Sequence, residues 1–158
     1  MMRSWPTEVK RGAPAFRASF AHESMKTLRE RPEWAEIEKA FEKEALVGLR
    51  EAPTSGWLPL SFDIEMCRAA ADVLTPAALR SMGLRNVQRT SQKPLLAPFE
   101  KASRTLIHHN PAAGIRFMAR GVAALYRDCG TFEVRNRPAP FPELVWCQPP
   151  TEAFSSSF

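Results

Sequence analysis

The feature that most constrains this chain is the stretch from Asn110 to Val134, which carries its own start signal, apolar face and stop signal. Asn110 is a good helix N-cap, and Pro111 follows at the first helical position, where a missing backbone N–H costs nothing. Gly130 predicts a left-handed stop at the helix end, and the β-prone residues after it predict a strand. The stretch therefore predicts one helix that runs into one strand.

Apolar residues recur along this predicted helix at helical spacing. At about 100° per residue, one apolar arc contains Ile115, Met118, Val122, Leu125, Tyr126 and Cys129. A separate basic stripe is formed by Arg116, Arg120 and Arg127. The pattern predicts a core helix with a basic outer side, and it identifies no reaction.

Helical patterns also fill the part of the chain before this stretch. The predicted helices are Ser19 to Arg29, Glu33 to Ala45, Ser61 to Leu74 with Ser61 as N-cap, a helix that starts at Thr75-Pro76 and bends or ends near Gly83, and Leu95 to His108. After Gly130, the β-prone runs Thr131 to Arg135 and Glu143 to Cys147 predict an antiparallel hairpin. The predicted fold class is α+β, with a mostly helical N-terminal two-thirds packed on a small C-terminal antiparallel β-hairpin or sheet.

The length of the chain favours one domain. With 158 residues, of which 44% are hydrophobic, the chain is long enough for one core and too short for two comfortable ones. We expect a flexible basic arm over residues 1–17, a single α+β domain over 18–148, and a disordered tail over 149–158.

The charges are unevenly distributed. From Glu30 to Glu51 there are seven acids against four bases, net −3, whereas from Pro76 to Arg137 there are eleven bases against three acids, net +8. Such a charge dipole could steer an anionic ligand, a nucleic acid or an acidic partner. Without a nucleic-acid motif, a solvated arginine-rich surface is the favoured interpretation.

Several function classes lack their sequence signals. There is no apolar signal segment and no window long enough to cross a membrane, which predicts a cytoplasmic protein. Cys67, Cys129 and Cys147 are widely spaced, form no C-x-x-C pair and are interpreted as reduced apolar residues. Hydrolase, zinc-protease, P-loop and dinucleotide-binding motifs are missing, so we predict a protein that is not an enzyme.

No metal and no cofactor are expected. His108 and His109 are adjacent, and adjacent residues on a helix point about 100° apart, so ligation of one ion by both is disfavoured. The favoured interpretation is that they interact with the dipole at the C-terminal end of a helix.

A series of spaced motifs resembles a known family. The motifs are KRGAPAF at Lys10 to Phe16, W-L-P-L at Trp57 to Leu60, L-R-S-M-G at Leu79 to Gly83, P-x-x-x-x-R-F at Pro111 to Phe117, and L-Y-R-D-C-G-T-F-E-V at Leu125 to Val134. The family is a paralogous group of uncharacterised domains, abundant in myxobacteria and distantly similar to heme nitric-oxide-binding and 4-vinyl-reductase-type small-molecule sensor domains. The resemblance spans roughly residues 12–149.

This resemblance implies an α+β domain with a buried apolar cavity between helices and sheet. Family members continue past the second strand with a helix and closing strands, whereas this chain has only PPTEAFSSSF there. The heme relatives carry a Tyr-x-Ser-x-Arg signature, which the segment from Tyr126 to Gly130 does not match, so heme is not expected.

Two groups of residues are candidates for binding small molecules. Flat aromatic and flexible methionine side chains suit an apolar pocket, and the candidates for its lining are Trp57, Pro59, Phe62, Met66, Met118 and Val122. These residues could equally fill a core. Arg116, Arg120 and Arg127 could bind a phosphate or carboxylate, although a solvent-facing helix surface is the favoured interpretation.

The leading functional hypothesis is a non-catalytic cytoplasmic sensor-type domain that binds a small apolar ligand in signalling or regulation. The alternative is a protein–protein interaction module that self-associates or completes its sheet with a partner chain through the Glu143 to Cys147 strand edge. Nucleic-acid binding is the third and weakest hypothesis, and membrane binding is not expected.

Overall fold

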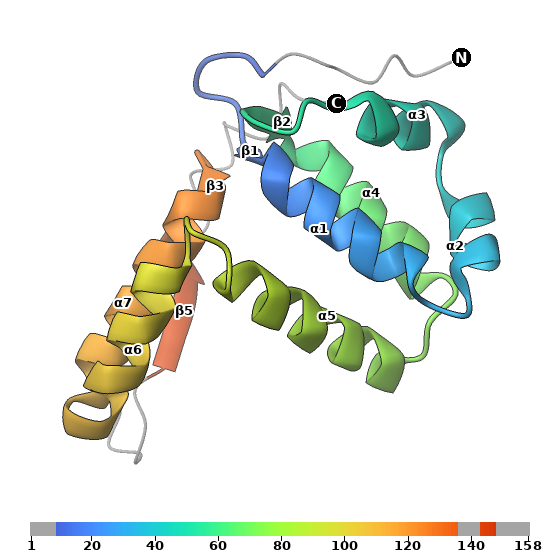
Figure 1. Cartoon of the computed structure of the whole chain (residues 1–158). Helices are drawn as coiled ribbons and strands as arrows, with labels where there is room; N and C mark the ends of the chain where they lie inside the picture. Colours follow the sequence, from blue (N-terminus) through green and yellow to red (C-terminus); the bar gives the residue numbers. More distant parts are fainter. Residues whose placement is uncertain (1–8, 136–142, 148–158) are drawn as a thin grey trace. The chain divides into compact units, whose positions relative to one another are not determined.

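The computed structural model describes residues 9–135 and 143–147, and the regular structure is mostly helical (Figure 1). By contacts the chain divides into two compact units, Met1–Thr90 and Ser91–Phe158, which we call unit 1 and unit 2. Each unit combines helices with short antiparallel strands. The predicted α+β class, with a helical majority and an antiparallel pair of strands near the C-terminus, is confirmed.

Unit 1 holds two short strands and the first five helices. The elements are β1 (Ala15–Arg17), α1 (Ala18–Arg29), α2 (Trp34–Ala40), α3 (Lys43–Glu51), β2 (Trp57–Pro59), α4 (Leu60–Ala71) and α5 (Pro76–Ser91), whose last residue begins unit 2. β1 and β2 pair antiparallel, with Phe16 opposite Leu58. Figure 1 shows α1 and α4 side by side, and both pack against β1.

The core of unit 1 is built from the apolar faces of these elements. Phe16, Ile37 and Phe62 are at most 1% exposed, and Leu28 and Met66 are almost as deeply buried. Burial of a large apolar side chain stabilises the fold by roughly 1.5–3 kcal/mol. The spacing of Met25 and Leu28 on α1, and of Phe62 and Met66 on α4, therefore produced the predicted buried faces.

The predicted helix from Glu33 to Ala45 is wrong in its continuity. It is interrupted after Ala40, because Phe41 and Glu42 adopt extended backbone angles (φ −66°, ψ 144° and φ −63°, ψ 132°). The apolar spacing nevertheless predicts burial correctly, since Ile37, Phe41 and Ala45 are all buried. No glycine or proline lies at the break, which indicates a tertiary cause.

The predicted start of α4 is also wrong. Pro59, not Ser61, precedes the helix, and Ser61 lies inside it. The backbone N–H of Leu60 donates to the Pro14 carbonyl at 3.0 Å, so β2 passes directly into the helix where its pairing with the first strand ends. The helix also ends at Ala71, three residues before the predicted Leu74.

The helix predicted to start at Thr75-Pro76 is α5. Thr75 caps it, because the Ala78 N–H donates to the Thr75 hydroxyl at 3.3 Å. The predicted bend or end near Gly83 is wrong as an end, since the helix continues to Ser91. Nothing lies within 4 Å of the position that a Cβ at Gly83 would occupy, so this glycine meets no close neighbour. The predicted break at Lys93-Pro94 is confirmed by the gap before the next helix.

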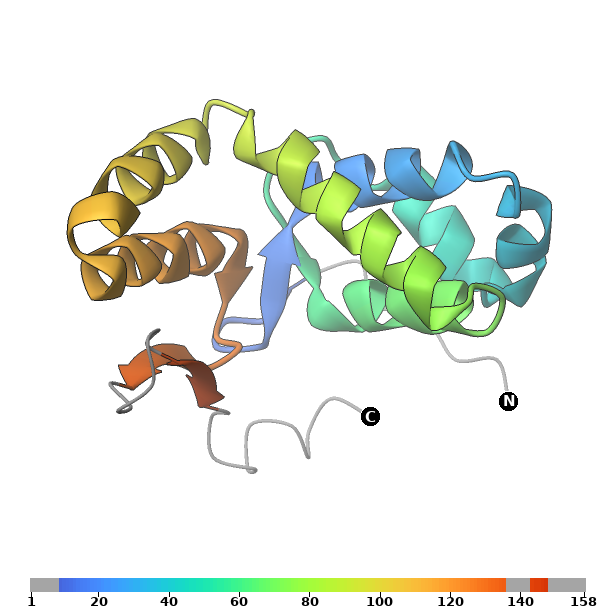
Figure 2. The same cartoon turned by 90° about the horizontal axis from the view of Figure 1, so that it is seen from below.

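Unit 2 begins with a pair of helices, α6 (Ala97–His109) and α7 (Pro111–Leu125), which lie side by side (Figure 2). The N-cap prediction is confirmed, because the Asn110 side chain accepts a hydrogen bond from the Ala113 N–H at 3.1 Å. Gly114 allows the close approach of the helices, since a Cβ there would lie 2.9 Å from the Ile107 backbone nitrogen. The buried Ser103 hydroxyl donates to the Gly114 carbonyl at 3.0 Å across the same contact.

The predicted end of the helix at Gly130 is wrong. Helix α7 ends at Leu125, and Tyr126 and Arg127 form the short strand β3. Asp128 and Gly130 both have positive φ, at 56° and 106°, so the left-handed glycine ends a turn after β3 rather than the helix. Two residues of the predicted apolar arc, Tyr126 and Cys129, therefore lie beyond the end of the helix. Tyr126 is β-prone by residue type, and Cys129 is buried.

The predicted C-terminal hairpin is confirmed. β4 (Thr131–Arg135) and β5 (Glu143–Cys147) pair antiparallel over five residue pairs, from Thr131 opposite Cys147 to Arg135 opposite Glu143. Helix α7 packs against β4. A two-stranded ribbon is marginally stable alone, and this helix gives it support.

The domain boundaries differ from the prediction at two places. Ala15 to Arg17, predicted as the end of the basic arm, forms β1, and Ala15 and Phe16 are fully buried. The predicted single domain over 18–148 falls into the two compact units. The predicted tail over 149–158 lies outside the described residues.

Candidate functional site

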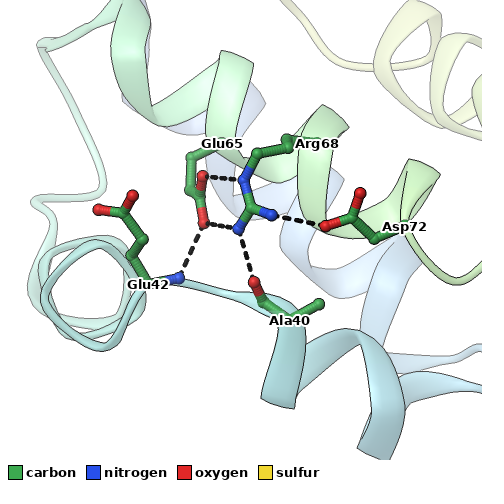
Figure 3. A network of polar contacts seen from close by, with 5 residues as sticks. All are labelled: Ala40, Glu42, Glu65, Arg68 and Asp72. Atoms are coloured by element: carbon green, nitrogen blue, oxygen red, sulfur yellow. Dashed lines mark hydrogen bonds and ion pairs between the residues drawn. The ribbon is translucent and has the colours of Figure 1, made fainter.

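A buried carboxylate is the centre of a polar network in unit 1 (Figure 3). Glu65 on α4 is 4% exposed. One of its oxygens accepts a hydrogen bond from the Glu42 backbone N–H at 2.8 Å, and Arg68 donates to both oxygens at 2.7 and 2.8 Å. A buried carboxylate is costly unless it is paired in this way.

Arg68 connects the carboxylate to the end of α2. Its guanidinium donates to the Ala40 carbonyl at 2.6 Å and to the Asp72 carboxylate at 2.6 Å (Figure 3). Ala40 is the last residue of α2, and Glu42 is the extended residue that directly precedes α3. The Glu65–Arg68 pair thus binds the Ala40 carbonyl and the Glu42 N–H, two backbone groups that a continuous helix would have bonded internally. We call these five residues the α4 clamp: Ala40, Glu42, Glu65, Arg68 and Asp72.

The hydrogen bonds of the α4 clamp keep the Glu65 carboxyl and the Arg68 guanidinium in their charged forms. Burial raises the pKa of the Glu65 carboxyl, but the hydrogen bonds from Arg68 and from the Glu42 N–H outweigh it, so the pKa is lowered. The hydrogen bond to Glu65 raises the pKa of the Arg68 guanidinium. Neither group exchanges a proton near neutral pH, so the arrangement is suited to holding helices together rather than to acid–base chemistry.

Sequence reasoning missed the α4 clamp, although one signal was present. Glu65 lies three residues after Phe62 and four before Ala69, in line with the buried stripe of α4. A carboxylate in an apolar stripe with an arginine one turn later predicts a paired buried charge.

The predicted pocket residues are divided between the two units. In unit 1, Phe62 and Met66 are buried on α4, and Trp57 and Pro59 are half-buried on β2. The Arg17 guanidinium lies 4.2 Å from the centre of the Trp57 ring. In unit 2, Val122 is half-buried on α7, and Met118 lies on the same helix with its side chain outside the described residues. The ligand pocket therefore stays a prediction.

The predicted basic stripe is only partly formed. Arg116 and Arg120 are exposed on α7, and the Arg120 guanidinium lies 5.3 Å from the centre of the Phe117 ring. Arg127 is not on this helix but on β3, where its Nε lies 3.5 Å from the Asp128 carboxylate. The helix end at Leu125 thus removes the third arginine from the stripe.

The histidines and cysteines give no composite site in the described part of the chain. His108 and His109 are exposed in the last turn of α6. Within residues 9–135 and 143–147, no three His, Cys, Asp or Glu side chains are grouped as metal ligands would be. Cys67 is exposed, and Cys129 is buried, with its thiol donating to the Arg127 carbonyl at 3.1 Å.

The candidate interaction site is the β4–β5 ribbon. These two strands form a two-stranded sheet of their own, in which β5 is an edge strand. An edge strand presents backbone N–H and C=O groups that another strand can pair with. Glu143–Cys147, the predicted partner-binding edge, forms a strand with the predicted bounds, and its partner stays a prediction.

The described helices are all too short or too polar to cross a membrane. The chain matches no family model, no curated protein and no solved structure.

Proposed function

We propose that this chain is a non-catalytic cytoplasmic interaction module that self-associates through the β5 edge. The observation that carries the proposal is the two-stranded β4–β5 sheet, whose register is defined over five residue pairs. A ribbon of this size gains stability when further strands are added. A second copy of β5 would supply such a strand.

The sequence of β5 suits pairing with itself. In a two-fold antiparallel arrangement centred on Val145, Leu144 of one copy lies opposite Trp146 of the other, and this pair occurs twice. Glu143, the strand's one charged residue, lies opposite Cys147 and so meets no like charge. Aromatic–aliphatic pairs of this kind contribute roughly 0.2–1 kcal/mol each.

The test is native mass spectrometry of the full chain over a dilution series, with Val145→Lys and Cys147→Lys as matched variants. Val145→Lys places two lysines opposite each other across the two-fold axis, while within one chain the new lysine lies opposite Glu133 on β4. Cys147→Lys adds the same charge to the same strand but places it opposite Glu143 of the second copy. We expect a dimer for the wild type and for Cys147→Lys, and a monomer for Val145→Lys. A wild type that stays monomeric at every concentration contradicts self-association.

The sensor-type function is the second candidate, and the arrangement on α4 and β2 supports it. Phe62 and Met66 lie on the buried side of α4, and half-buried Trp57 and Pro59 lie on the strand that leads into it. The resemblance to small-molecule sensor domains belongs to the same proposal. Extra mass that is present in the native spectrum and absent from a denaturing spectrum would identify a bound ligand. Bare protein in both spectra would count against this function.

A further inference from the structure

Helix α5 has an inner side that contacts α1 and an outer side that is exposed. Its inner side faces α1, where the Asn86 amide donates to the Ser24 hydroxyl at 2.8 Å and the Arg89 guanidinium pairs with Glu30 at 2.5 Å. Thr90, on the same side, is 5% exposed. This side of the helix is the one by which α5 is attached to unit 1.

The opposite side of α5 carries large apolar side chains that face solvent. Leu84 is 60% exposed and Val87 is 61% exposed, and the two lie three residues apart on one face. Exposed Arg80 lies one turn before Leu84 on the same face. We call these three residues the outer face of α5. Neighbouring apolar side chains that are exposed and flanked by charged residues are typical of an interaction surface.

The charge of α5 is of one sign. The helix carries Arg80, Arg85 and Arg89 and no acidic residue. Arg89 pairs with Glu30, and exposed Arg85 also attracts that carboxylate, whereas exposed Arg80 lies on the outer face itself. A partner that covers Leu84 and Val87 would therefore place its own flanking residues next to two arginines, which favours carboxylates there.

We propose that the outer face of α5 binds an acidic amphipathic helix of a partner protein. Leucine-type side chains of that helix would contact Leu84 and Val87, and its glutamates or aspartates would pair with Arg80 and Arg85. Two large apolar side chains on one helical turn match the i, i+3, i+4 anchors of a helix. They are few for binding a lipid surface, which needs a longer apolar face with many basic residues. The surface is separate from the β5 edge, so this proposal does not depend on self-association.

The experiment uses the full-length chain and a fluorescent synthetic helix of roughly 16 residues, with leucines at i, i+3, i+4 and i+7 and glutamates elsewhere. Its matched control peptide keeps the leucines and replaces the glutamates by lysines. Fluorescence polarisation is measured for the wild type, Leu84→Lys, Arg80→Glu and Ile64→Lys. Ile64 is the control position, because it is an equally exposed apolar residue (56%) on α4.

We expect the acidic peptide to bind the wild type and Ile64→Lys equally, and to bind Leu84→Lys and Arg80→Glu at least about tenfold more weakly. Several outcomes would overturn the proposal: no binding to the wild type, equal binding of the basic peptide, or an equal loss in Ile64→Lys. A dimer that Leu84→Lys dissociates would show that a second copy covers the face. Sedimentation with anionic vesicles, lost in Leu84→Lys and without peptide binding, would assign it to a membrane surface. A fall in unfolding stability of Leu84→Lys, absent from Ile64→Lys, would show that the side chain is covered within the chain itself.

Discussion

Glu65 and Arg68, one turn apart on α4, form a bidentate ion pair that bridges the break between α2 and α3 (Figure 3). The carboxylate accepts a hydrogen bond from the Glu42 N–H within the break, and the guanidinium donates to the carbonyl of Ala40, the last residue of α2. Two side chains of α4 thus replace the helical hydrogen bonds that an uninterrupted helix would make. The direction of the chain between α2 and α3 therefore depends on the Glu65–Arg68 ion pair, which lies more than twenty residues further along the sequence.

Replacement of Glu65 by glutamine should destabilise unit 1. Glu65→Gln keeps the size of the side chain but removes the charge, so the Arg68 pairing weakens and one oxygen acceptor is lost. We expect a loss of about 1–3 kcal/mol in the free energy of unfolding, measured by urea denaturation followed by circular dichroism. The matched control is Asp72→Asn at the 53% exposed end of the same network, which should change stability by less than about 0.5 kcal/mol. Equal effects of the two variants would contradict the central role of the buried carboxylate.

Acidification should weaken the fold through the same group. The folded-state pKa of Glu65 lies below the ordinary value of 4.5, so the unfolded chain takes up its proton first as the pH falls. The stabilisation is therefore fully present above pH 4.5 and is lost as the pH falls through the lowered folded-state pKa. Urea denaturation from pH 7 to pH 3 should show a smaller decline for Glu65→Gln than for the wild type. Parallel declines would show that other carboxyls, such as Glu30 and Glu33, whose pKa values are also lowered, account for the acid sensitivity.

Two glycine-to-alanine substitutions in unit 1 should act in opposite directions. A Cβ at Gly48 on α3 would lie 2.9 Å from the ring of Phe62, which is 1% exposed and cannot move freely, so overpacking should cost about 1–3 kcal/mol. A Cβ at Gly83 on α5 meets nothing within 4 Å, so Gly83→Ala should stabilise the protein by about 0.5–1 kcal/mol through helix propensity. Thermal unfolding compares the two variants directly. A stabilising Gly48→Ala would mean that the α3–α4 contact is looser than the distance indicates.

The features that the sequence predicts correctly are those with local causes. The Thr75 and Asn110 caps follow from side chains that bond the backbone three residues on, and the hairpin follows from two β-prone runs joined by a short proline-rich link. The break after Ala40 has no local signal, because it depends on Glu65 and Arg68 in another helix. The early end of α7 is of the same kind, since Tyr126 has extended backbone where the apolar period alone would continue the helix.

Among the candidate sites, too, the one with a local sequence pattern was predicted and the one that depends on tertiary packing was not. The edge strand at Glu143 to Cys147 could be predicted because its pattern is local. The outer face of α5 was missed, because a helix pattern does not say which of its apolar residues a neighbouring helix covers. The basic stripe was overestimated because it assumed that Arg127 shares a helix with Arg116.

The Asn110 cap gives a test of unit 2 alone. Its side-chain oxygen accepts the Ala113 N–H at 3.1 Å at the start of α7, while Pro111 at the next position needs no hydrogen-bond partner for its nitrogen. Asn110→Ala leaves that N–H without its cap, and we expect a loss of about 1 kcal/mol in unfolding free energy. Asn110→Ser, which restores an acceptor, should recover most of the loss, and hydrogen exchange should locate the change in the first turn of α7. Faster exchange confined to residues 9–90 in Asn110→Ala, with none in that turn, would show that the cap does not stabilise unit 2.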